Sequence, residues 1–236
     1  MMNPIPISLS WSGGKDSAFA LYLLKNNPSY QVVRLHTTFS ETTSRVGMHG
    51  IREELIQAQA DELGIPLDKL YYPASGENQA YENAINQYLE RLSLEGIHQL
   101  GYGDIFLEDL RKYRESQLAQ KGFQAVFPLW KRSTPQLARE FIEEGFKTLI
   151  CTIDPELVPK SFLGEVFDFQ FLKAIDGIAD PCGENGEFHT FCFEGPIFKN
   201  PLPVHVEGHV EQLYKIPLEN GEVAQKAFSF AEISLA

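Results

Sequence analysis

The amino-acid sequence predicts an α/β protein, in which a parallel sheet with helices on both faces is followed by a smaller C-terminal α+β domain. Over residues 1–154, short runs of β-branched and aromatic residues alternate with longer helical patterns, joined by short connections. That alternation is typical of parallel sheets whose crossover connections are helices. Beyond residue 154 the regular alternation stops. The predicted domains are therefore a nucleotide-binding domain, residues 1–154, and a substrate-binding domain, residues 155–236.

The predicted strands of the first domain are short apolar segments, several of them rich in Val, Ile or Thr, which pack well in sheets. They span residues 5–11, 31–39, 67–74, 99–102, 124–129 and 146–153. In the second domain, residues 187–193 and 203–210 alternate apolar and polar side chains, which indicates antiparallel strands.

The predicted helices lie between these strands, and most of them end at a glycine, the usual residue just past a helix C-terminus. Residues 16–25 place Ala18, Leu21 and Leu24 on one apolar face. Ser133 is a hydroxyl cap followed by a proline, a common way to start a helix. The helices are expected over residues 16–25, 50–63, 78–94, 107–120 and 133–145.

Composition narrows the classes of protein and of partner. The 236 residues are 43% hydrophobic and 22% charged, which excludes a disordered chain. The net charge of −12 disfavours binding to nucleic acid or to an anionic membrane, because both need a cationic surface. Three cysteines make no disulfide framework, and the sequence shows neither a signal peptide nor a membrane span. We expect a reduced, cytoplasmic protein.

The most informative segment is Ser12-Gly-Gly-Lys-Asp-Ser17, which follows the first predicted strand and opens the first helix. The two glycines let the backbone approach an anion closely, and the free N–H groups at a helix start favour phosphate. Lys15 adds a positive charge, and the two serines add hydroxyl donors. The competing interpretation is an ordinary glycine turn with a polar cap. A Walker A loop is excluded because Leu9 stands where its first glycine belongs.

A second polar segment, residues 101–115, begins at the end of a predicted strand, the edge at which open α/β sheets bind ligands. Asp104 and Glu108 are candidates for holding Mg²⁺, and Arg111 and Arg114 for reaching a phosphate or a carboxylate. For Arg111 the alternative, a charge that faces water on a helix, is favoured. For Gly103 and Asp104 a functional role is favoured.

A third segment, residues 183–198, is dense in acid–base and hydrogen-bonding groups. A period of two predicts that Glu187 and His189 share one face of a strand. A zinc site built from Cys182, Glu187, His189 and Cys192 is an unfavoured alternative, because their spacing matches no usual ligand pattern.

These segments carry a resemblance to a known family. The string S-G-G-K-D-S at 12–17 resembles the PP-loop of the ATP pyrophosphatases. With M-H-G-I-R-E-E-L at 48–55, G-Y-G-D-I at 101–105 and G-E-N-G-E-F-H-T-F at 183–191, the chain is similar to the diphthine–ammonia ligase family over nearly its whole length. The resemblance implies a five-stranded parallel sheet of order 3-2-1-4-5 and a smaller C-terminal domain.

The resemblance also implies an activity. In that family, ATP activates a carboxylate as an acyl-adenylate with release of pyrophosphate, and ammonia then converts it to an amide. The expected partners are ATP with Mg²⁺, ammonia or another amine, and a carboxylate acceptor, for which a translation elongation factor is one candidate. A membrane partner is not expected, and a homodimer is left open.

Site residues follow from the resemblance, position by position. The ATP phosphates are assigned to Ser12, Gly13, Gly14, Lys15, Asp16 and Ser17. The ribose and adenine are assigned to His36, Thr37, Thr38, Met48 and His49, and the α-phosphate to Gly103 and Asp104. The acceptor is assigned to Glu184, Gly186, Glu187, His189 and Thr190. Catalysis is assigned to Lys15, Asp104, Glu187 and His189, and Mg²⁺ to Asp16 and Asp104.

Two alternatives remain beside the ligase. A PP-loop enzyme that thiolates RNA would need a pair of reactive cysteines and a basic surface. A non-catalytic protein that binds adenine nucleotides would bind ATP without releasing pyrophosphate. The family more typically has G-A-I where this chain has Gly103-Asp-Ile105, and G-E-G-G-E-Y-E-T where it has Gly183-Glu-Asn-Gly-Glu-Phe-His-Thr190. The identity of the acceptor therefore stays open.

Overall fold

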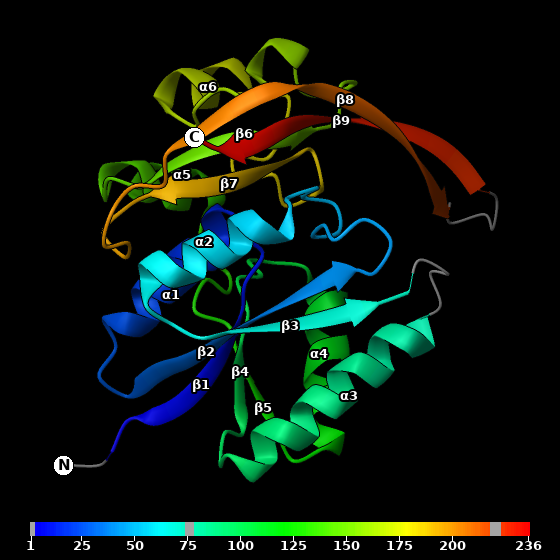
Figure 1. Ribbon diagram of the computed structural model, residues 1–236. Helices are drawn as coiled ribbons and strands as arrows, with labels where there is room; N and C mark the ends of the chain where they lie inside the picture. The colour runs from blue at the N-terminus through cyan, green and yellow to red at the C-terminus, as the bar shows by residue number, and fades with distance from the viewer. Residues whose placement is uncertain (1–2, 74–77, 218–222) are drawn as a thin grey trace.

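A computed structural model describes residues 3–73, 78–217 and 223–236 and shows two sheets with a helical layer between them (Figure 1). The first sheet is entirely parallel and five-stranded, with the order β3-β2-β1-β4-β5. Its strands are β1 (Ile5–Ser10), β2 (Tyr30–Ser40), β3 (Leu67–Tyr72), β4 (Gln99–Gly101) and β5 (Gln124–Val126). The predicted fold class and strand order are confirmed; the predicted end of the third strand, residue 74, lies outside the described residues.

Four helices cover the two faces of this sheet. They are α1 (Lys15–Lys25), α2 (Glu53–Leu63), α3 (Asn78–Leu94) and α4 (Glu108–Gln120). Figure 1 shows α1 and α2 on the face toward the second sheet, and α3 and α4 on the opposite face. Gly64 ends α2 in the left-handed region, with φ of 66°, where a residue without Cβ is least strained.

The second sheet is antiparallel, with the order β7-β6-β9-β8. Its strands are β6 (Lys147–Ile153), β7 (Phe188–Glu194), β8 (Val204–Pro217) and β9 (Val223–Leu235), and the helices α5 (Thr134–Glu143) and α6 (Phe169–Ala174) lie beside it, with a short 3-10 helix at Lys160–Phe162. The strand predicted over residues 146–153 therefore forms, but in the second sheet. The predicted domain boundary after residue 154 stays a prediction.

Two regions of the second domain differ from the sequence-based expectation. The strand expected over residues 203–210 continues to Pro217, and β9, which the sequence pattern did not predict, pairs with it along its length.

Among the described residues, no helix has the length and apolar character needed to cross a membrane.

One hydrophobic core joins the two sheets. It runs from Leu21 on α1 and Ile56 on α2 to Phe141 on α5 and Phe191 on β7, all of them buried. Because α1 and α2 pack on both sheets, the carboxyl edge of the first sheet is held close to the start of β7. A second cluster, which includes Leu89, packs α3 and α4 beneath the first sheet. The fold thus brings the phosphate-loop segment and the 183–191 segment together.

Candidate active site

A cavity of about 710 Å³ opens where β1 and β4 end and β7 begins. We call it the phosphate-loop cavity. Side chains from all three polar segments line it, together with two residues that follow β2. The predicted site residues that line it are Ser12, Lys15, Asp16, Ser17, Met48, His49, Gly103, Asp104, Glu184, Gly186, His189 and Thr190. The structure therefore gathers most of the predicted site at one place.

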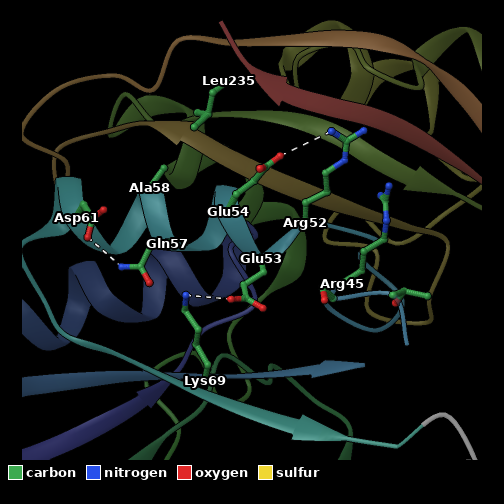
Figure 2. A pocket seen from close by; sticks show the side chains of 11 residues that line it. Arg45, Arg52, Glu53, Glu54, Gln57, Ala58, Asp61, Lys69 and Leu235 are labelled. Atoms are coloured by element: carbon green, nitrogen blue, oxygen red, sulfur yellow. Dashed lines mark hydrogen bonds and ion pairs between the residues drawn. The ribbon is translucent and has the colours of Figure 1, made fainter. Parts of the chain in front are cut away.

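A second, more open groove of about 790 Å³ lies along α2 (Figure 2). Four of its charged side chains form two ion pairs: Lys69 Nζ lies 3.0 Å from Glu53 Oε1, and Arg52 Nη1 lies 3.7 Å from Glu54 Oε1. None of the predicted site residues lines it. We therefore take the phosphate-loop cavity as the candidate site.

The glycines of the loop allow close packing around the start of α1. A Cβ atom on Gly14 would lie 2.9 Å from His49 Cε1 and 2.9 Å from the carbonyl oxygen of Thr190, which leaves no room for a side chain. Ser17 Oγ donates to the carbonyl oxygen of Gly14 at 3.0 Å, so its hydroxyl helps to hold the turn. The N-terminus of α1 opens toward the cavity, where backbone N–H groups and the helix dipole favour an anion.

Lys15 is buried beneath this loop, with 4% of its surface exposed. Its Nζ donates to Asp16 Oδ1 at 2.7 Å, to Asp16 Oδ2 at 2.8 Å, and to the carbonyl oxygen of Cys182. Burial alone would lower the pKa of Lys15, but Asp16, Cys182 and Glu184 outweigh it and raise the pKa above its ordinary value. The ammonium group stays charged throughout the neutral range.

Asp104 and Arg114 form a partly buried ion pair at the other side of the cavity. Arg114 Nε lies 2.9 Å from Asp104 Oδ2, and the guanidinium group lies 4.1 Å from the centre of the Tyr102 ring. Burial raises the pKa of Asp104, and Arg114 opposes that rise. Arg114 therefore offsets part of the effect of burial on this shielded carboxyl group.

The donor set fits Mg²⁺ better than zinc. Asp16 and Asp104 line the same cavity, and each offers carboxylate oxygens, which are hard ligands. Mg²⁺ in nucleotide sites commonly takes one or two carboxylates together with phosphates and water. The described residues contain no group of three His, Cys, Asp or Glu side chains able to hold a metal, so the zinc alternative finds no support there.

On the opposite wall lie Glu184 and two histidines, whose pKa values are shifted by burial. Burial, reinforced by the charge of Asp16, raises the pKa of Glu184 to about 7. The rings of His49 and His189 lie 4.4 Å apart. Burial lowers the pKa of His49 to about 4 and that of His189 well below its ordinary value. Both imidazoles are therefore neutral at pH 7.

Glu187 turns away from this wall. Its Oε1 accepts the N–H of Asp180 and the side-chain amide of Asn185, each at 3.0 Å, and its Oε2 accepts the N–H of Asn185 at 2.9 Å. Glu187 comes one residue before β7 and does not line the cavity, whereas His189 does, so the two side chains do not face the site together as the period of two suggested. Glu187 braces the 180–187 loop, and its predicted catalytic role stays a prediction.

The three residues predicted near the ribose lie within β2, outside the cavity lining. His36 is buried, with Nδ1 2.9 Å from Ser8 Oγ. Thr37 Oγ1 donates to the carbonyl oxygen of Trp11 at 2.5 Å, and Thr38 pairs with Leu70 of β3. The first two support the end of β1 just before the loop. Contact of these residues with a nucleotide stays a prediction.

Sequence reasoning missed the lining residues that come from β9. Lys226 and Phe228 of β9 line the cavity, and Lys226 Nζ pairs with the buried carboxylate of Asp154. Phe228 and Phe230 flank Ser229, and Ile233 follows Glu232, a weak strand signal from which no strand was predicted. Gln59 of α2 was also missed: it stands four residues from both Leu55 and Leu63 on a buried face, where a polar side chain is unusual.

Comparison with known proteins connects most of the chain to one family. The family model described as "Diphthamide synthase N-terminal domain" matches residues 7–125, and the model described as "Diphthamide synthase C-terminal domain" matches residues 133–221. A diphthine–ammonia ligase of Danio rerio is 24% identical, over 81% of this chain and 83% of that protein. The corresponding protein of Rattus norvegicus is 24% identical, over 82% and 80% respectively.

Two further similarities are more limited. A diphthine–ammonia ligase of Homo sapiens is 30% identical over 49% of this chain and 44% of that protein. Among solved structures, the U34-tRNA thiolase NcsA of Methanococcus maripaludis, determined with its [4Fe-4S] cluster, is 21% identical and covers 60% of this chain and 58% of that chain. Its TM-score of 0.38 is too low to bear on the function of this chain.

Proposed function

The chain belongs to the diphthamide synthase family, and from that premise we propose that it is an ATP-dependent ligase that joins ammonia to a carboxylate and releases AMP and pyrophosphate. The observation that carries the proposal is the single cavity that contains both the start of α1 with Lys15 and the wall of Glu184, His189 and Thr190. A phosphate site and an acid–base wall that share one cavity can place a nucleotide and an acceptor in contact.

At the phosphate end, the loop N–H groups, the hydroxyls of Ser12 and Ser17 and the ammonium group of Lys15 would hold the ATP phosphates. Fixed donors of this kind stabilise the negative charge that develops on the departing pyrophosphate. Asp16 and Asp104 would hold Mg²⁺, which supplies further neutralisation of phosphate charge when bound. Met48 and His49, on the loop after β2, would contact the base.

At the other wall, Glu184, Gly186, His189 and Thr190 would hold the acceptor. A carboxylate oxygen of the acceptor attacks the α-phosphorus of ATP, and the bond from that phosphorus to pyrophosphate breaks. Ammonia then attacks the acyl carbon, the C–N bond forms, and AMP leaves. The proton released from nitrogen goes to Glu184, because a carboxyl group with a pKa of about 7 accepts and returns protons near neutral pH.

In this proposal each of the two predicted domains binds one substrate. The first sheet with its helices binds the nucleotide, and the C-terminal domain that begins after residue 154 binds the acceptor.

The RNA-thiolation alternative gains no support from the cysteines: Cys151, Cys182 and Cys192 are buried, and burial raises the pKa of each thiol above its ordinary value.

The test is ATP turnover by the purified chain with Mg²⁺ and ammonium, in an assay that separates AMP plus pyrophosphate from ADP plus phosphate. One arm adds an elongation factor that bears diphthine, a second adds an extract of small metabolites, and a third omits ammonium. AMP with the elongation factor supports a diphthine ligase, and AMP with the extract alone supports ligation of another carboxylate. ADP as the product contradicts the proposal.

A further inference from the structure

We infer that Gln59 of α2 is a positioning residue for ATP: its amide fixes the phosphate loop against β7, so the loop holds its phosphate-binding shape only while the second sheet is docked on it. The inference rests on the proposed ATP site, because it assigns a role to a residue that lies behind that site. Gln59 itself does not line the phosphate-loop cavity.

One buried amide connects three segments of the chain. Gln59 is fully buried on α2. Its Oε1 accepts the indole N–H of Trp11, at the end of β1, at 2.8 Å. Its Nε2 donates to the carbonyl oxygen of Gly13 at 2.9 Å and to that of Cys192, on β7, at 2.6 Å. The residue before the phosphate loop, the loop itself and β7 therefore meet at one side chain.

β7 also contacts the loop directly. The N–H of Cys192 donates to the carbonyl oxygen of Gly13 at 2.8 Å, and the N–H of Lys15 donates to Thr190 Oγ1 at 3.0 Å. The carbonyl oxygen of Gly13 thus accepts two hydrogen bonds, one from β7 and one from Gln59. The amide closes this arrangement by binding the carbonyl groups of Gly13 and Cys192 at once.

The chemistry of the site selects glutamine. The position needs two donors and one acceptor in one planar group, which an amide provides. An ionised glutamate has no donor, and a methionine has none either. The fit is also steric, because a Cβ atom on Gly13 would lie 2.7 Å from Gln59 Oε1 and 2.5 Å from Ile56 Cδ1. The phosphate loop can therefore approach α2 closely only because residue 13 is a glycine and has no Cβ atom.

The hydrogen bonds of Gln59 affect the positions of both walls of the cavity. His189 and Thr190 of β7 face the cavity, and Lys15 faces it from the loop. Because Gln59 holds β7 and the loop to each other, it sets the spacing between the phosphate-binding and acceptor-binding walls. Loss of the amide should therefore weaken the binding of phosphates more than the binding of the nucleoside.

The experiment measures the dissociation constants of ATP and of adenosine by calorimetry for the full chain and for Gln59→Met. We expect ATP to bind at least tenfold more weakly and adenosine to bind within about twofold of the unsubstituted chain. Gln57→Met is the matched control on the same helix: Figure 2 shows Gln57 bonded to Asp61 beside the open groove. Leu63→Ala, also on α2, controls for loss of stability alone.

A second variant covers the case in which Gln59→Met does not fold. Gln59→Glu keeps the size of the side chain, and its neutral acid form donates one hydrogen bond where the carboxylate donates none. We expect the ratio of its ATP dissociation constant to that of the unsubstituted chain to fall as the pH is lowered from 7.5 to 5.5. Unchanged ATP affinity in either variant, or equal losses for ATP and adenosine, would overturn the inference. AMP formation is not part of this readout, so failure of the ligase proposal is seen separately.

Discussion

The two walls of the phosphate-loop cavity are built in different ways. On the phosphate wall, Lys15 is paired with its own neighbour in sequence, Asp16, and remains charged. On the other wall, burial leaves His49 and His189 neutral and brings the pKa of Glu184 to about 7. One wall therefore carries a fixed charge, whereas the other carries two neutral imidazoles and one carboxyl group, that of Glu184, whose charge changes near pH 7. Substitutions and changes of pH should therefore have different effects on the functions of the two walls.

The largest effect is expected on the phosphate wall. Lys15→Ala should lower the rate of pyrophosphate release by a factor of about 10² to 10³ or more, because it removes the charge that stabilises the leaving phosphates. It also leaves Asp16 with no ammonium group beside it. The measurement is pyrophosphate release at saturating ATP, with circular dichroism to confirm that the variant is folded.

The control is Lys25→Ala, at the exposed far end of the same helix. It should leave the rate of pyrophosphate release unchanged. If Lys15→Ala turns over normally while folded, the assignment of residues 12–17 to the ATP phosphates is wrong.

The second-largest effect on activity is expected from Glu187, which lies behind the acceptor-binding wall. Glu187→Gln should leave the affinity for ATP within about twofold but lower acceptor-dependent AMP formation about 10- to 100-fold, because a small displacement of the 180–187 loop misplaces the groups that hold the acceptor. Rates with and without acceptor measure this. Glu194→Gln, at the far end of β7, is the control. Loss of ATP affinity in Glu187→Gln would instead place that residue in the nucleotide site.

Glu187 should also make the stability of this loop depend on pH in the acid range. Although burial opposes it, hydrogen bonds from Asn185 and Asp180 lower the pKa of Glu187 below its ordinary value of 4.5. Its contribution to the free energy of unfolding is therefore present above pH 4.5 and is lost as the pH falls below that value. Thermal midpoints of Glu187→Gln and of the unsubstituted chain should converge toward low pH; a constant gap would contradict this.

A smaller effect should appear as a pH dependence of ATP binding. As the pH rises through about 7, Glu184 ionises beside Asp16, and the added negative charge should weaken ATP binding by up to about tenfold. The same ionisation removes stability: the contribution of Glu184 is complete below pH 4.5 and is lost as the pH rises through 7. Calorimetric titrations from pH 6 to 8 would test this against Glu184→Gln, in which the Glu184 part of the slope should vanish. An identical slope in both proteins would contradict the assignment.

The smallest effect on function is expected from His36, which lies in β2 outside the lining of the cavity. His36→Gln disturbs the buried hydrogen bond to Ser8 and should lower the free energy of unfolding by about 1–3 kcal/mol. The affinity for ATP should change by less than about twofold, because His36 does not line the cavity. Denaturant unfolding and ATP titration measure the two quantities. A tenfold loss of affinity would return His36 to the nucleotide site that the family resemblance implies.

Local sequence signals predicted the first sheet and its helices well, and they identified the 12–17 segment that lines the cavity. The glycines at the ends of helices, the alternating strands and the 12–17 segment act through near neighbours in the chain, so they can be identified without the tertiary structure. The parallel sheet that they predicted is confirmed; its strand order, also confirmed, was implied by the family resemblance and not by local signals.

The opposite wall depends on contacts between distant segments, and there the sequence was less informative. Glu187 does not face the cavity because its carboxylate accepts hydrogen bonds from Asp180 and Asn185 in the loop before β7. Lys226 enters the cavity on β9, a strand that only pairing with β8 and β6 defines. Gln59 acquires its role from Trp11, Gly13 and Cys192 together, and no local pattern joins those three positions.

The contact between Lys15 and Thr190 joins residues 175 positions apart in the chain. During synthesis, the segment that forms the first sheet leaves the ribosome well before β7 exists, and N-terminal regions generally fold first. A nascent chain that stops before residue 188 would carry the S-G-G-K-D-S string without the strand that shapes it. The ability to bind ATP should therefore arise late in synthesis, so that an unfinished molecule would not consume nucleotide.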